Sequence, residues 1–442
     1  MYFIYVAYEF PPLQSGGVYR TLGLVNCLKN SGLTPIIITR NIDSIKSSEK
    51  EFHLDYSLIN ELNPEALVFR IPTSLNTQNK SNFRNKFRII SNPNGVEAKY
   101  WKRNVLNQLD DIVKKYKPQF VLTTAPPFSI IDLGYVISKK YKLRHIIDLR
   151  DAWSNWFTSP YFTYFHYLVK FRKEKFHLNS ADKVIVTSKQ TIDDFKKVHK
   201  QLNQSKFIYI PNGFDGPLLN WDDSCSVDKI KIGYVGSFYY QPEANDLMLS
   251  SWKDRKGHHK LKYSPNRQNW LYRSPYFFFK SIQKLILTHP EFQNKIELHF
   301  IGKKEVWFDN MVSEFSLKKQ IFHQGVKDRS ESINFQREMD WLLITSSKVI
   351  GGSDYSIAGK TFEYFQVQKP ILAFVCKGAQ RDLLMDSGQA LICDPDNTEQ
   401  SVKQMMEYFQ KNKRLTPNVS FIKQHSRLNL SKIFVEELKN TI

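Results

Sequence analysis

The sequence predicts an α/β protein made of two domains, each built on a parallel β-sheet. Its 442 residues are more than one hydrophobic core usually holds. Short apolar runs alternate with longer amphipathic runs, as they do where helices connect the strands of a parallel sheet. The alternation is interrupted around residue 212 and starts again at residue 230. We therefore expect domains at 1–212 and 213–420, followed by a C-terminal helix at 421–442.

The first domain opens with a βαβ pattern. Strand-like runs occupy 2–7 and 34–39, and a helical pattern at 18–30 lies between them. Further elements follow as a strand at 119–123, a helix from about residue 130, and strands at 144–148, 183–187 and 207–210. The polar stretch at 44–81 shows no regular pattern. Strands that alternate with helices in this way form a parallel sheet covered on both faces.

The second domain repeats the alternation with one long interruption. Strands are expected at 230–235, 296–301, 320–323, 341–344, 370–375 and 390–393. An insertion at about 241–272 separates the first two of them and is rich in basic and aromatic side chains. Its cationic residues include Lys253, Arg255, Lys256 and Lys260. Loops of this length are usually functional or mobile.

Composition and charge narrow the classes of function. Hydrophobic residues make up 41% and charged residues 24% of the chain, which is typical of a globular protein and argues against disorder. We find neither a membrane-spanning run nor a signal peptide, so we expect a cytoplasmic protein. The four cysteines are far apart and lack metal-ligand spacing. The formal net charge of +20 attracts anionic substrates, acidic membrane surfaces or polyanions.

Two glycines mark the first candidate site. Ser15, Gly16 and Gly17 stand between the first predicted strand and the first predicted helix. Glycine lets a backbone approach a ligand closely, and a helix N-terminus offers unpaired N–H groups to a phosphate. A plain tight turn explains the same residues equally well.

A second candidate site begins at Gly359. Helical spacing places Lys360 and Glu363 on one face near the start of a helix. There the cation and the helix N–H groups suit a diphosphate, and the carboxylate suits the hydroxyls of a ribose. Taken alone, the two side chains are more simply explained as a surface ion pair.

The order and spacing of these segments resemble the retaining glycosyltransferase family 4, whose members have the GT-B fold. The resemblance covers nearly the whole chain. It is carried by Pro11-Pro12 to Gly16-Gly17 with Arg20, by Asp148-Leu149-Arg150-Asp151-Ala152-Trp153, by Pro211-Asn212-Gly213, by 233–237, and by Gly359-Lys360 to Glu363-Tyr364. It implies two Rossmann-like domains that face each other across a cleft, with the C-terminal helix crossing back to the first domain. It also implies that a nucleotide sugar binds mainly to the second domain, without a metal or other cofactor.

The resemblance further implies roles for single residues. Gly16 and Gly17 match the family's glycine loop beside the donor diphosphate. Glu363 matches a glutamate that contacts the nucleotide ribose. Lys360 and Arg273 match basic residues that compensate the diphosphate charge, and they are the predicted catalytic groups.

The sequence also departs from the family pattern. Tyr355 stands where the family has the first glutamate of a pair, with Asp354 beside it. We keep Asp354 and Gly359 as donor-binding candidates. The segment Asp394-Pro395-Asp396 spells a pattern of metal-dependent transferases, but it lies far from the donor motifs in the sequence, so no metal site is predicted.

Two further segments are candidates for acceptor or surface contacts. Arg150 and Asp151 follow the predicted strand 144–148, and ligands of open α/β sheets gather at such strand ends. A helix cap with a local salt bridge is the alternative. The run at 161–173 mixes aromatic and basic side chains, as interfacial helices do, although core packing explains such a stripe as well.

The sequence therefore predicts a glycosyltransferase that moves a sugar from a nucleotide diphosphate sugar to a hydroxyl of a saccharide or lipid-linked acceptor, with retention. Contact of the insertion with an anionic acceptor or with the anionic inner membrane surface is a further hypothesis. Two alternatives stay open. The charge permits a nucleic-acid or polyanion-binding protein, although no nucleic-acid motif is found, and a GT-B nucleotide-sugar epimerase would share the fold.

Overall fold

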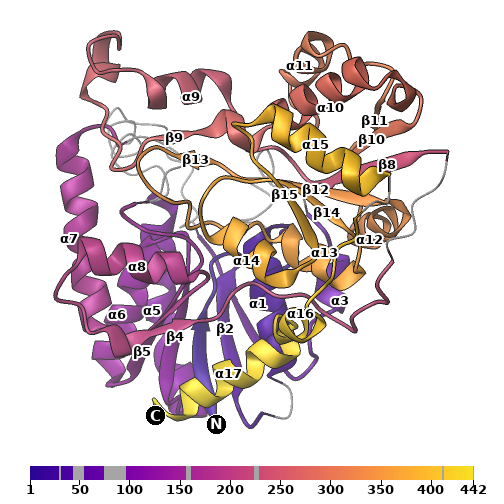
Figure 1. Ribbon diagram of the computed structural model, residues 1–442. Coiled ribbons are helices and arrows are strands. Elements are labelled where there is room, and N and C mark those ends of the chain that lie inside the picture. The colour runs from indigo at the N-terminus through magenta and orange to yellow at the C-terminus, as the bar shows by residue number, and fades with distance from the viewer. Residues whose placement is uncertain are drawn as a thin grey trace.

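The protein consists of two α/β domains, one on each side of a shared interface (Figure 1). The structure, a computed structural model, describes residues 1–28, 31–42, 54–73, 96–155, 161–222, 228–410 and 413–441. Within these ranges no helix is both long and apolar enough to cross a membrane. The first domain lies below in Figure 1 and the second above, and both chain termini lie beside the first sheet.

The first sheet is parallel and has the strand order β3-β2-β1-β4-β5-β6-β7. Its strands are β1 (Tyr2–Val6), β2 (Thr34–Arg40), β3 (Leu67–Ile71), β4 (Phe120–Ala125), β5 (Arg144–Leu149), β6 (Lys183–Val186) and β7 (Phe207–Tyr209). The order in which strands are added to the sheet changes direction between β1 and β4. The strands β2 and β3 lie on one side of β1, and all later strands lie on the other. Such a switch point leaves a crevice at the carboxyl ends of the strands, where ligands of this sheet type bind.

Alternate residues of β1 support two separate core layers. Phe3 and Tyr5 pack in a cluster with side chains of α1 (Gly16–Cys27) and α17 (Arg427–Lys439). Ile4 and Val6 point to the opposite face and pack in a cluster with side chains of α5 (Val96–Tyr116) and α6 (Ser129–Tyr141). Beyond these helices the domain adds α3 (Ser57–Asn60), α7 (Tyr164–Ser180) and α8 (Lys189–Val198). The predicted return of the C-terminal helix to the first domain is confirmed by α17.

The second sheet is parallel and follows the order β11-β10-β8-β12-β14-β15, with its switch point between β8 and β12. Its strands are β8 (Ile230–Val235), β10 (Ile296–Ile301), β11 (Ile321–His323), β12 (Trp341–Thr345), β14 (Ile371–Phe374) and β15 (Ala390–Cys393). Its helices are α10 (Tyr276–Thr288), α11 (Phe308–Glu314), α12 (Arg329–Glu338), α13 (Lys360–Val367), α14 (Ala379–Ser387), α15 (Thr398–Phe409) and α16 (Val419–Gln424). The predicted pair of α/β domains is thereby confirmed.

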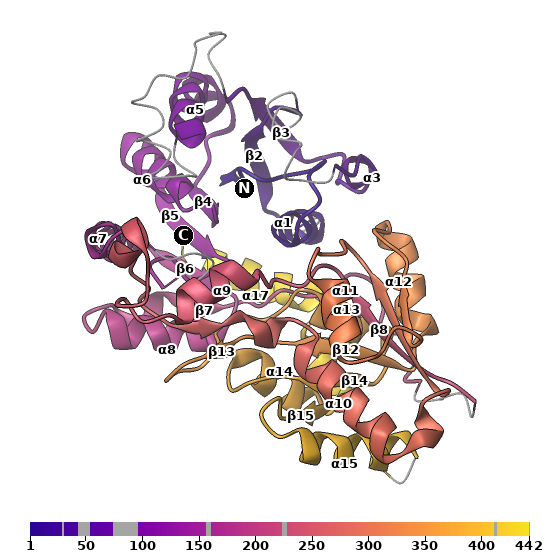
Figure 2. The ribbon, with the colours of Figure 1, turned by 90° about the horizontal axis from the view of Figure 1, so that it is seen from above.

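The insertion at 241–272 is a folded strap. It contains α9 (Pro242–Leu249), two 3-10 turns and the short strand β9 (Gln268–Asn269), which pairs antiparallel with β13 (Lys348–Val349). At its far end Tyr263 pairs with Tyr161 of the first domain through both backbone N–H groups, at N···O distances of 2.8 and 2.9 Å. Figures 1 and 2 both show the strap beside the N-terminal end of α7.

Two sequence predictions of local structure need correction. The helix predicted to start at residue 18 starts at Gly16, because the Ser15 side chain caps it by accepting a hydrogen bond from the backbone N–H of Val18. The stretch 44–81, predicted to be irregular, contains β3. This strand lies at the sheet edge and is only half-buried, and its Arg70 breaks the apolar run that would have revealed it. Part of the stretch lies outside the described residues.

Candidate functional site

The two switch points bring most of the predicted site residues to the domain interface. Ala152, which follows β5, packs against Tyr355 of the second domain in a small buried cluster. The charge of Arg273 in the second domain also acts on the carboxyl of Asp151 in the first and opposes the rise of its pKa. The site is therefore composed of side chains from both halves of the chain.

Lys360 is the central cation of the second domain. It is the first residue of α13, and its ammonium nitrogen lies 3.6 Å from the centre of the Tyr234 ring, at the end of β8. Burial lowers the pKa of Lys360 from 10.5 to about 7, opposed by the charge of Glu363. It forms no ion pair with any residue that the structure describes. A ligand phosphate would supply the missing negative charge.

Glu363 lies one helical turn after Lys360, as the sequence spacing predicts. Burial raises the pKa of the Glu363 carboxyl above 4.5, although Arg329 and a hydrogen bond from the Gln336 amide at 3.3 Å oppose this. The carboxylate also influences the pKa of Tyr19 on α1 of the first domain. Glu363 therefore faces the interface near the N-terminal part of α1.

Arg273 and Asp354 occupy neighbouring loops. Arg273 directly follows the strap, at the end of a 3-10 turn, and donates a hydrogen bond to the Ser356 hydroxyl at 3.2 Å. Asp354 is almost fully buried, and its carboxylate accepts hydrogen bonds from the Ser347 hydroxyl and from both the hydroxyl and backbone N–H of Ser356. Asp354 thus fixes the loop that holds Ser356 against Arg273. Gly359 is exposed before α13.

The two glycines of the first domain differ in their surroundings. A methyl group at Gly17 would overlap the guanidinium of Arg150, whereas a methyl group at Gly16 would meet nothing within 4 Å. The Arg150 guanidinium donates a hydrogen bond to the Pro126 carbonyl and lies 3.6 Å from the carboxylate of Glu9. Gly17 therefore has a local packing reason to be glycine, and Gly16, which is exposed, has none.

Asp151 is the candidate acid on the first domain. Burial raises its pKa above 3.8, with Arg150 and Arg273 opposing the shift. Its carboxylate receives no hydrogen bond from the residues in the described ranges. Its loop is firmly anchored, because Ser154 donates from its backbone N–H and its hydroxyl to the buried carboxylate of Glu174 at 2.5 and 2.7 Å.

Other residues of the resemblance have structural partners. Arg20 is buried and pairs with Asp148 at 2.9 Å, and it also donates to the carbonyls of Ile210 and Pro211. This contact ties α1 to β5 and to the segment after β7. Asp396 accepts from Lys348 at 2.6 Å and from the Tyr272 hydroxyl.

Sequence reasoning missed two charged residues at the interface. Glu9 follows the end of β1, and its position at the switch point was the signal that could have marked it. Arg329 pairs with Glu61 of the first domain at 3.1 Å and with Asp215 at 2.9 Å. Arg329, Glu61 and Asp215 line a pocket of about 350 Å³ between the domains, together with Tyr19, Leu22, Gly23 and Asn26 of α1. No local motif marks Arg329.

Comparison with solved structures identifies the fold as GT-B. The lipopolysaccharide outer core galactosyltransferase WaaB in its apo form matches over 100% of both chains at 10% identity, with a TM-score of 0.60. A sucrose-phosphate synthase from Thermosynechococcus elongatus matches over 99% of this chain and 94% of its own at 12% identity, with a TM-score of 0.55. A UDP-GlcNAc 2-epimerase from Methanocaldococcus jannaschii matches over 100% of both chains at 11% identity, with a TM-score of 0.52. No family model and no curated protein matches the sequence.

Proposed function

We propose that the protein transfers a sugar from a nucleotide diphosphate sugar to a hydroxyl of a saccharide or lipid-linked acceptor, with retention and without a metal. The observation that carries this proposal is Lys360, a desolvated cation without an ion-pair partner in the described chain, at the N-terminus of α13 and beside the second switch point. Helix N-termini and cations stabilise phosphate charge.

The donor would bind mainly to the second domain. Its diphosphate would lie against Lys360 and Arg273, where two cations can stabilise the charge that develops as the diphosphate leaves. Its ribose would reach Glu363, whose carboxylate accepts hydrogen bonds. Gly16, exposed and without close neighbours, leaves room for the donor on the side of the first domain.

The acceptor would approach from the first domain. Its hydroxyl attacks the anomeric carbon on the face from which the diphosphate departs, so that the new C–O bond forms as the old one breaks. The hydroxyl proton passes to the departing phosphate oxygen. Asp151 is the candidate to hold the acceptor, because its loop is anchored by Glu174 and its carboxyl lies within the electrostatic influence of Arg273.

A thermal-shift panel of nucleotide sugars tests this proposal. Because a ligand that binds only the folded state raises its apparent stability, one donor should raise Tm progressively once its concentration exceeds its dissociation constant. Transfer of the sugar from that donor to acceptors then tests the reaction. If no nucleotide sugar raises Tm, the proposal is wrong. A product that is an epimer of the donor, formed without an acceptor, would identify an epimerase.

Kinetics of Lys360→Ala and Arg273→Ala test the assigned roles. Both changes should lower turnover more than they raise the Michaelis constant of the donor, because their charge matters most as the diphosphate leaves. Full activity of Arg273→Ala would show that another basic residue of the second domain has this role.

A further inference from the structure

Helix α7 presents a row of largely exposed side chains, of which Phe176 packs partly against the Tyr135 ring of α6 at a centroid distance of 5.1 Å. Phe165, Val169, Arg172 and Phe176 are spaced by four, three and four residues, so they lie along one side of the helix. Phe165 is 67% exposed and Phe176 50%. Phe162, just before the helix, is exposed as well. Exposed apolar side chains that line up in this way mark an interaction surface.

The other side of α7 accounts for its internal packing. Tyr167 and Phe171 are neighbours, and the ring of Phe171 lies 4.6 Å from that of the buried His199. Glu174 is buried and bonded to Ser154 and His199. The helix is therefore apolar on two sides, and only one of them belongs to the core. Apart from the contact of Phe176 with Tyr135, the exposed row takes no part in this core packing.

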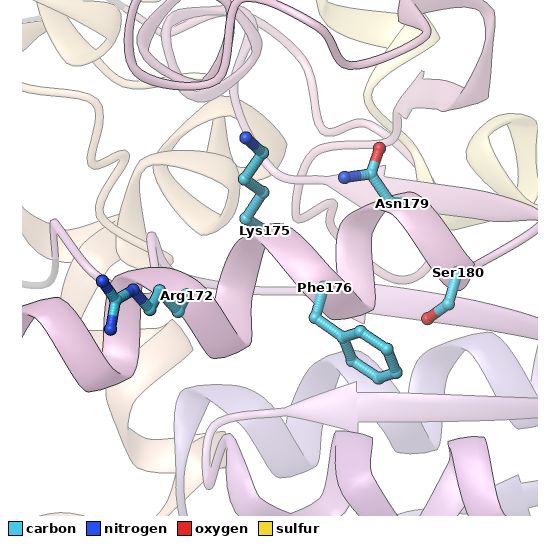
Figure 3. A pocket seen from close by; sticks show the side chains of 5 residues that line it. All are labelled: Arg172, Lys175, Phe176, Asn179 and Ser180. Atoms are coloured by element: carbon cyan, nitrogen blue, oxygen red, sulfur yellow. The ribbon is translucent and has the colours of Figure 1, made fainter.

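Most charges around the row are positive. Arg172, Lys173 and Lys175 are exposed, whereas the one acidic residue of α7, Glu174, is buried. Asp132 of α6 lines one flank and pairs with Lys173 at 3.5 Å, which leaves Arg172 and Lys175 as the flanking cations. Figure 3 shows Arg172, Lys175 and Phe176 projecting from the helix in different directions. Phe176 and Arg172 line open hollows on two flanks of α7, one with Asn179 and Ser180, the other with Tyr135 and Val136 of α6. This surface combines an apolar row with flanking cations, as helices bound at a membrane interface do.

The strap continues this surface beyond the start of α7. The Tyr263 ring lies 4.8 Å from that of Tyr164, in addition to the backbone pairing described above. Trp252 is 63% and Leu261 66% exposed. Exposed cations of the strap include Lys253, Lys256 and Lys260, with one exposed acid, Asp254, among them. Arg255 differs, because its guanidinium donates to the carbonyls of Ser250 and Lys262 and so holds the strap together.

We propose that the outer face of α7, extended by the strap, binds the surface of an anionic lipid bilayer. The helix has 17 residues and would lie in the plane of the interface, with Phe165, Val169 and Phe176 in the acyl boundary and the cations at the headgroups. A second copy of the chain fits poorly, because symmetric pairing of α7 would enclose the cations of both copies, Arg172 and Lys175 among them, in one interface.

This inference does not rest on the proposed function. If both hold, the site is close to the membrane, because the Tyr161 hydroxyl donates to the Ser154 carbonyl at 2.8 Å, three residues after Asp151. A lipid-linked acceptor would then reach Asp151 from the bilayer that α7 contacts.

Vesicle flotation tests the inference without any substrate. The full chain should float with vesicles of phosphatidylcholine that contain phosphatidylglycerol, and not with pure phosphatidylcholine, at low salt. The triple variant Phe162→Ser, Phe165→Ser and Phe176→Ser should lower the apparent partition coefficient about tenfold or more. The control triple variant Leu287→Ser, Val306→Ser and Met385→Ser replaces side chains exposed on the second domain and should bind as the wild type does.

Charge is tested separately. Arg172→Gln with Lys175→Gln should weaken binding about tenfold or more, whereas Lys318→Gln with Lys319→Gln, which are exposed on the second domain, should change it little. A fluorophore on Phe165→Cys should report an apolar environment on vesicle binding, and one on Leu287→Cys should not. This reading serves even if the triple variant fails to fold.

Three results would overturn the inference. The first is a wild-type chain that stays unbound or binds neutral vesicles equally well. The second is unchanged vesicle binding of a folded triple variant, or an unchanged signal at Phe165→Cys. The third is binding of random oligonucleotides that the same variants abolish while vesicle binding persists.

Discussion

The two switch points use their charged residues in opposite ways. In the first domain Arg20 forms a buried ion pair with Asp148 at 2.9 Å. Arg150 forms an ion pair with Glu9 and a hydrogen bond to the Pro126 carbonyl. In the second domain Lys360 lies over the ring of Tyr234 and has no ion-pair partner in the described part of the chain. A cation whose charge is already balanced holds the fold, and a desolvated cation without a counter-ion is available to a ligand.

The largest expected effect is a loss of stability, and it tests whether the paired Arg20 holds the fold. Arg20→Ala should lower the free energy of unfolding by about 3–5 kcal/mol, because Asp148 would be left buried without its partner. Chemical denaturation measures the change. Arg103→Ala, at an exposed position, should change stability by less than about 0.5 kcal/mol. If the two substitutions changed stability equally, the ion pair of Arg20 with Asp148 would have no structural role.

The next effect is a loss of turnover, and it tests whether the unpaired Lys360 binds the donor diphosphate. Lys360→Ala should lower turnover about 10²–10³-fold, as loss of one group that stabilises developing charge does. It should destabilise the free protein much less than Arg20→Ala does, since the contact with the Tyr234 ring is lost but no ion pair is. Turnover and thermal unfolding are measured in parallel, with the exposed Lys280→Ala as control. A destabilised variant with normal turnover would reverse the comparison.

A smaller effect is expected at Glu363. Glu363→Ala should weaken donor binding by about 1.5–3 kcal/mol, the value of a hydrogen bond to a charged group. Calorimetric titration measures this affinity, and the exposed Glu338→Ala is the matched control. Donor affinity equal to that of the wild type would place Glu363 outside the site.

The smallest effects separate the two glycines. Gly17→Ala forces the Arg150 guanidinium to move and should lower stability, whereas Gly16→Ala meets no atom and should leave stability equal or higher by up to about 1 kcal/mol. If Gly16 borders the donor, the second variant weakens donor binding all the same. A Gly16→Ala protein with unchanged donor affinity would limit the role of this loop to Gly17 and Arg150.

The fold was predictable because strands buried on both faces of a parallel sheet appear in the sequence as short apolar runs, and the helices between them as amphipathic runs. The strands β8, β10 and β15 start and end where the apolar runs do. The edge strand β3 escaped prediction because half of its environment is solvent. The strap was predicted only as a long basic insertion, since its contact with Tyr161 depends on packing between domains that no local pattern encodes.

The candidate site was predictable to the extent that spacing determines it. Lys360 and Glu363 lie on one turn of α13, as their separation requires. The sequence could not distinguish a paired from an unpaired charge, because partners such as Asp148 for Arg20 are 128 residues apart. For the same reason it could not show that Arg329 joins the domains. The contacts of Asp354 with Ser347 and Ser356 are local, but no sequence pattern distinguishes such loop contacts from contacts with a ligand.

The coupling of donor binding to protonation tests the central claim most directly. Because the pKa of Lys360 is lowered to about 7, the free protein has this amine largely neutral at pH 8. A bound diphosphate favours the charged form and raises that pKa, so binding takes up a proton and weakens as the pH rises above 7.

The measurement is calorimetric titration of the donor found by thermal shift, at pH 8 in two buffers of different ionisation enthalpy. A sugar diphosphate has no proton to exchange at this pH, so the uptake reports the protein. We predict net proton uptake in the wild type and its loss in Lys360→Met. Donor binding without proton uptake, or with the same uptake in Lys360→Met, would contradict the assignment of Lys360 to the diphosphate.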